Sequence, residues 1–155
     1  MALRRSNEEN GATKVMLYIP PILELSMIGV VDAGIPNRER VCLRPTDTIN
    51  LAQFGLHAAI KSDKGYVTPI HNLFFWFGDI VVTPPCWLVI LTGKGQRATN
   101  PLIEDGKVIY VFYWNLENVI FNVPEVVPVA FKIQSILIGH NVLPEKQRQI
   151  ANPAQ

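Results

Sequence analysis

Short apolar runs bounded by proline and glycine constrain the fold of this chain more than any other feature of its sequence. The runs cover residues 22–31, 73–77, 86–92, 108–114 and 129–138. Runs of this length, rich in valine, isoleucine and aromatic residues and closed by turn formers, fit the half-buried surface of a β-sheet better than a helix. We therefore expect an all-β domain.

The number and spacing of the runs predict the architecture. About eight or nine short strands fit between residues 22 and 139, with no helix-length periodicity between them. This pattern favours a two-sheet sandwich, and a jelly roll with a similar number of strands is the alternative. We expect a polar, flexible N-terminal arm over residues 1–13, a single sandwich domain over residues 14–140, and a C-terminal tail over residues 141–155 with a short helical turn after Pro144.

The strand predicted over residues 38–44 carries a row of three arginines, Arg38, Arg40 and Arg44. Val41 and Leu43 alternate with them and should point into the core. Together the guanidinium groups offer contacts for phosphate or carboxylate groups. A charged strand face that prevents edge-to-edge aggregation explains the same pattern, and we favour this interpretation.

Two aromatic runs, residues 74–77 and 110–114, contain more rings than one strand face can bury. Core packing accounts for alternate members, and for the others we favour a protein interface as cover. Stacking platforms for sugars or bases are the alternative use of these rings. Our candidate interaction surface consists of Arg38, Arg40, Arg44, Phe75, Trp76, Tyr113 and Trp114.

Net charge and composition limit the kinds of binding partner that we expect. The formal net charge is +1, so no global field steers the protein toward nucleic acid or an anionic membrane. Charged residues make up 17% of the chain, against about 25% in ordinary soluble domains, while hydrophobic residues reach 48%. Because soluble monomers rarely expose large apolar patches, we infer that another copy of the chain or a partner covers part of this surface.

Residues that perform chemistry are scattered. His57, His71 and His140 lack the spacing of metal ligands, and no G-x-S-x-G elbow is present. Cys42 and Cys86 lie in apolar strands, where free buried thiols are favoured and a single disulfide stays open. We therefore expect no enzyme, no metal and no cofactor.

The start of the chain does not have the pattern of a secretory leader. Pro20 and Pro21 interrupt the apolar stretch 15–23, and Glu24 ends it. No apolar run reaches the roughly 18 to 20 residues of a spanning helix. We expect a cytoplasmic protein, or one assembled into a particle after cytoplasmic synthesis.

Three segments occur in the order of a known family. They read NRERVCL at residues 37–43, NLAQFGL at residues 50–56 and VTPPCWLVILTGKG at residues 82–95. They resemble the N-x-E-x-V-x-I, D-L-S-G-W-x-L and L-x-P-G-x-x-L-V-V-x-T-G-x-G segments of lamin-tail domains, over roughly residues 22–139. Gln53 and Phe54 depart from the usual Gly-Trp pair, Pro85 replaces the turn glycine, and NVPE at residues 122–125 stands in place of N-N-x-G-D. The resemblance implies an immunoglobulin-like sandwich with an interaction role and no catalytic residues.

These observations lead to two functional hypotheses. The first is a non-enzymatic β-sandwich that acts through protein–protein contacts, as a homo-oligomer or as a structural subunit of a larger assembly. The alternative is a binding module for carbohydrate or nucleic acid that uses exposed aromatic residues and the arginine row.

Overall fold

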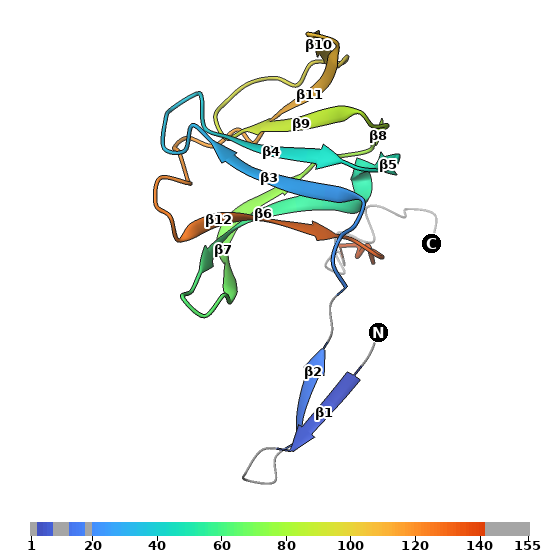
Figure 1. Ribbon diagram of the computed structural model, residues 1–155, viewed down its shortest axis with the longest axis vertical. Coiled ribbons are helices and arrows are strands. Elements are labelled where there is room, and N and C mark those ends of the chain that lie inside the picture. The colour runs from blue at the N-terminus through green and yellow to red at the C-terminus, as the bar shows by residue number, and fades with distance from the viewer. Residues whose placement is uncertain (1–2, 8–12, 18–19, 142–155) are drawn as a thin grey trace, which may run out of the picture.

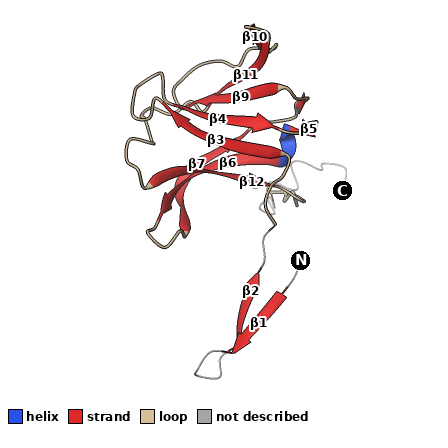
Figure 2. Ribbon diagram, viewed as in Figure 1, coloured by secondary structure: helices blue, strands red, loops and turns tan. Residues whose placement is uncertain are grey.

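The chain folds into an all-β sandwich, as the sequence predicts. A computed structural model describes residues 3–7, 13–17 and 20–141 (Figure 2). The elements are β1 (Leu3–Asn7), β2 (Thr13–Leu17), β3 (Leu25–Val31), β4 (Arg40–Pro45), β5 (Ile49–Asn50), the 3₁₀ helix η1 (Leu51–Gln53), β6 (Phe54–Lys61), β7 (Val67–Trp76), β8 (Val81–Val82), β9 (Cys86–Leu91), β10 (Leu102–Glu104), β11 (Lys107–Tyr113) and β12 (Val126–Lys132). In the part of the chain that the structure describes, η1 is the one helix, and its three residues compare with about 20 for a membrane span.

Two sheets form the body of the molecule (Figure 1). One has five strands in the order β10-β11-β9-β4-β3, and the other has three in the order β12-β6-β7. All neighbours in these sheets are antiparallel except β9 and β11, which run parallel. Two smaller pairings, β1 with β2 and β5 with β8, complete the sheet structure.

The core lies between the two sheets and follows the predicted alternation. Val41 and Leu43 of β4 are fully buried, whereas Arg40 and Arg44 point to the outer face. From the opposite sheet, Leu56 of β6 reaches the same core. Burying each aliphatic side chain of this size stabilises the fold by about 1.5–3 kcal/mol.

The segment after β11 does not form a β-hairpin with that strand. Residues 117–122 contain no strand, and β11 pairs with β10 and β9 instead. The backbone donors of this segment have other partners, because Leu116 donates to the Thr92 carbonyl (2.9 Å) and Ile120 and Phe121 donate to the Glu39 carboxylate. These contacts take the place of a strand ladder.

The N-terminal region contains a pair of strands. Strand β1 lies within residues 1–13, where the sequence indicated a polar, flexible arm, and it pairs with β2, because backbone pairing does not require an apolar pattern. The helical turn expected after Pro144 lies outside the described residues.

Candidate functional site

Glu39 is a fully buried acid that joins three loops. It precedes β4, and each of its two carboxylate oxygens accepts two hydrogen bonds. Oε2 accepts from the N–H groups of Gly34 (2.7 Å) and Phe121 (3.1 Å), and Oε1 accepts from Thr92 Oγ1 (3.0 Å) and the N–H of Ile120 (2.9 Å). We call this arrangement the Glu39 clasp. Its acceptors are occupied by the protein itself, so the clasp holds loops in place and is not a reactive site.

Clusters suited to metal binding do not occur in the part of the chain that the structure covers. No group of three or more His, Cys, Asp and Glu residues is arranged to hold an ion among residues 3–7, 13–17 and 20–141. Cys42 and Cys86 are both free and buried, Cys42 on the outer face of β4 and Cys86 on the core face of β9. Burial raises the pKa of both thiols, so both are protonated and unreactive at neutral pH.

The arginine row is less available for binding phosphate or carboxylate groups of a ligand than the sequence indicated. Arg40 Nη1 donates to Asp32 Oδ2 (2.6 Å), and Arg38 Nη2 lies 3.3 Å from the same oxygen. The hydrogen bond from Arg40 lowers the pKa of Asp32, so this carboxylate stays ionised, pairs with both arginines and offsets one of their two positive charges. Arg44 places its guanidinium 5.6 Å from the centre of the Trp87 ring. Arg40 and Arg44 share the outer face of β4 with Cys42, whereas Arg38 precedes the strand.

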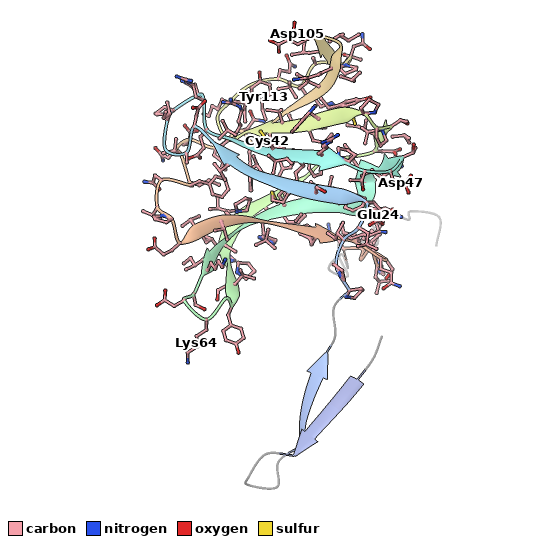
Figure 3. All side chains as sticks on the ribbon, viewed as in Figure 1. Glu24, Cys42, Asp47, Lys64, Asp105 and Tyr113 are labelled. Carbon is pink, nitrogen blue, oxygen red and sulfur yellow. The ribbon has the colours of Figure 1, made fainter. Side chains whose placement is uncertain are left out.

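Two of the four aromatic candidates do not lie on an outer face. Trp114 is only 8% exposed and belongs to the core, and the Phe75 ring packs against it with centroids 5.7 Å apart. Consecutive strand residues point to opposite faces, so Phe75 and its neighbour Trp76 cannot both be outside. Trp76 is 47% exposed, and Tyr113 lies on the outer side of β11, at the strand end labelled in Figure 3. Trp114 is therefore buried in the core, and Phe75 is partly buried against it.

The outer side of the three-stranded sheet carries a cluster of rings that we call the aromatic face. It consists of His57 of β6, Phe74 and Trp76 of β7, and Val129 and Phe131 of β12. Phe74 and Phe131 stack with centroids 5.3 Å apart, and His57 contacts both rings at 5.2 and 5.8 Å. The Trp76 indole N–H donates to the Ala52 carbonyl (2.8 Å), which fixes the ring on the surface.

Gly55 lies at the centre of the aromatic face. A Cβ at this position would overlap the Phe131 ring and lie 2.9 Å from the Phe75 carbonyl oxygen. The missing side chain lets the Phe131 ring lie over the strand, an arrangement known as aromatic rescue of a glycine. The imidazole of His57 is similarly enclosed, and its Nδ1 has no hydrogen-bond partner. The face is therefore rigid and apolar, with Phe74 (43%) and Trp76 exposed at its rim.

The outer side of the five-stranded sheet is apolar in part. Trp87, Val89 and Leu91 of β9 lie on it half-buried, beside Val111 and Tyr113 of β11. The outer side of β9 and β11 is thus apolar, whereas β4 of the same sheet carries Arg40 and Arg44 on this side. Sequence reasoning missed His57, Phe131 and Val129, although the alternation of residues 129–133 was a usable signal.

Comparisons of the chain with known protein families, with characterised proteins and with solved structures found no match. The fold itself defines the class of protein as an all-β two-sheet sandwich.

Proposed function

We propose that this protein is a non-enzymatic β-sandwich that acts through protein–protein contacts at the aromatic face, as a homo-oligomer or as a structural subunit of a larger assembly. The observation that carries the proposal is the exposed rim of Phe74 and Trp76 on a rigid apolar sheet surface. Aromatic anchors of this kind supply a large share of binding energy at protein interfaces. Because their rings are already held in place, binding costs little side-chain entropy.

The same proposal includes an immunoglobulin-like sandwich of the lamin-tail type. Glu39 lies in the segment NRERVCL that carries the resemblance, and the Glu39 clasp gives a physical reason for an acid at that position. The free thiols of Cys42 and Cys86 accord with synthesis in a reducing compartment.

Binding of carbohydrate or nucleic acid is the less favoured function. Asp32 pairs with both Arg38 and Arg40 and offsets one of their two positive charges, which weakens the arginine row as a phosphate site. Phe75 and Trp114 face the core and offer no stacking platform. Among the Phe and Trp rings of β7, only Phe74 and Trp76 keep an exposed face for a sugar or base.

Light scattering of the full chain across micromolar concentrations tests the proposal. Phe74→Asp replaces a ring whose burial is worth about 1.5–3 kcal/mol with a charge, so we expect association to weaken by about tenfold to a hundredfold. Val81→Asp is the matched control, because Val81 is 61% exposed on β8, away from the aromatic face. A strict monomer would contradict the homo-oligomer, and equal masses for both variants would contradict the role of the aromatic face.

A further inference from the structure

An apolar groove runs along the open flank of the sandwich, around the edge strand β12, and shares Val129 and Phe131 with the aromatic face. It is flanked by β3, the edge of the five-stranded sheet, and β12, the edge of the three-stranded sheet. Figure 1 shows the course of these two strands. Its volume is about 1210 Å³, larger than the roughly 300–1,000 Å³ of small-molecule sites and suited to a peptide segment. The apolar side chains that line it include Ile22, Leu23, Met27, Val129, Phe131 and Ile133.

Polar contacts hold the walls of the groove in place. Thr46 donates its N–H to the Glu24 carbonyl (2.9 Å) and its hydroxyl to the Leu23 carbonyl (2.8 Å), which fixes the segment before β3. Lys132 forms an ion pair with the Glu24 carboxylate and so connects the two edges (Figure 3 labels Glu24). The groove therefore exists before anything binds in it.

The strand edges beside the groove favour side-chain packing over an added β-strand. Within the described residues β3 pairs only with β4, and β12 only with β6, so each edge has unpaired backbone groups. Pro128 lacks an N–H in the middle of β12, and a bulge between Met27 and Gly29 interrupts β3. A continuous ladder cannot form on either edge, and an occupant would be held mainly by apolar contacts.

An apolar segment that needs cover follows directly after β12. Ile136, Leu137 and Ile138 are 62%, 100% and 83% exposed. The N–H of Ile133 donates to the Gln53 carbonyl (2.6 Å), which directs the chain past the end of η1 before the segment begins. The groove of the same molecule does not receive this segment, because none of its three residues lines the groove.

We propose that residues 136–138 of one copy pack into the groove between β3 and β12 of a second copy, and that the exchange is reciprocal. The donor segment and the acceptor groove adjoin on one flank of the molecule. A single two-fold axis can therefore place the segment of each copy in the groove of the other, which gives a closed dimer. The segment and the groove are complementary, because docking would bury three solvent-exposed aliphatic side chains in an apolar groove of sufficient size. This inference rests on the proposed function in its self-associating form and names the partner.

Sedimentation of the full chain and two variants tests the exchange. We expect Leu137→Asp to weaken dimerisation by at least about a hundredfold, because each dimer contains two copies of the lost contact. Leu137 makes no contribution to the core, so the variant should remain folded. Ser135→Asp, which adds the same charge at an exposed site outside the apolar triplet, should dimerise like the original chain. A Leu137→Asp dimer as stable as the Ser135→Asp dimer would overturn the inference.

A cross-link identifies where the segment docks. Leu137→Cys in one tagged copy and Leu23→Cys in an untagged copy should form a mixed disulfide dimer when combined. If a chain with both cysteines links only within itself, the segment occupies its own groove and the inference fails. Phe74→Asp helps to separate the two proposals. Association lost in Phe74→Asp and kept in Leu137→Asp would support the aromatic face and refute the exchange, and the reverse pattern would do the opposite. If both variants lose association, the mixed disulfide decides, because Phe74 stacks on Phe131, which also lines the groove.

Discussion

Replacing Glu39 with glutamine changes one oxygen of a fully buried carboxylate into an NH₂ group while keeping the size of the side chain. The carboxylate accepts four hydrogen bonds, two at each oxygen. In Glu39→Gln, one oxygen still serves two donors, and the NH₂ group faces the other two. If the NH₂ group faces the N–H groups of Gly34 and Phe121, two hydrogen bonds are lost. If it faces Thr92 and Ile120, the Thr92 hydroxyl can turn to the Glu39 carbonyl and accept from the NH₂ group, so the Ile120 bond is lost and the remaining bonds no longer have a charged acceptor.

The magnitude follows from the burial of these donors. A hydrogen bond to a charged acceptor contributes about 1.5–3 kcal/mol, and a buried donor left without a partner costs about 1–3 kcal/mol. The donors from Gly34 and Ile120 are only partly buried, so water can replace some of the loss. We expect the free energy of unfolding to fall by about 2–4 kcal/mol, a large share of the 5–15 kcal/mol typical of a domain.

Urea denaturation measures this loss. With a slope of about 2 kcal/mol per molar urea, the midpoint should shift down by about 1–2 M while the slope stays unchanged. Glu104→Gln is the matched control, because Glu104 is exposed on β10 and its substitution should leave the midpoint within about 0.3 M. A Glu39→Gln midpoint that coincides with that of Glu104→Gln would refute the role of the clasp.

Three further predictions concern charge, packing and thiol chemistry. The pKa of Asp32 in the folded protein lies below its ordinary value of 3.8, so the stability that its ion pairs contribute is present above that value and is lost as pH falls through the folded pKa. Asp32→Asn should therefore lose less stability than the original chain between pH 5 and pH 2. Equal losses in the two proteins would contradict the ion pairs. Gly55→Ala should lower the free energy of unfolding by about 1–3 kcal/mol in thermal melts, whereas Gly139→Ala, where a Cβ meets nothing, should be neutral; equal melting temperatures would contradict the packing at Gly55. Cys42 and Cys86 should react with a disulfide reagent at pH 8 far more slowly in the folded protein than in urea, and rapid reaction of the folded protein would contradict their burial.

The strands with a clear period of two could be predicted from the sequence. Val41 and Leu43 alternate with arginines, so the core face of β4 follows from the pattern alone. Strand β7 begins at Val67, before the predicted run, because Pro69 and His71 hide the strand signal there. The parallel pairing of β9 with β11 and the partners of Glu39 were not predictable, since no local pattern links segments so far apart in the chain.

The candidate surface was only partly predictable for a related reason. A run such as residues 74–77 shows that neighbouring rings point to opposite faces, but it does not show which set points inward. That choice depends on register: Gly55 pairs with both Trp76 and Phe131, and this places both rings outside. Trp76 is exposed, whereas placing Phe131 on the same face required knowledge of its cross-strand neighbour.

The Glu39 clasp also bears on when the domain can complete its folding during synthesis on the ribosome. Gly34 and Glu39 are synthesised early, whereas Ile120 and Phe121 leave the exit tunnel after most of the sandwich has been made. Until then the nascent chain holds an acid that two of its four donors have not yet reached, which opposes burial of that region. The domain therefore closes late in translation, and a chain that stops before residue 121 should remain open to chaperones and proteases.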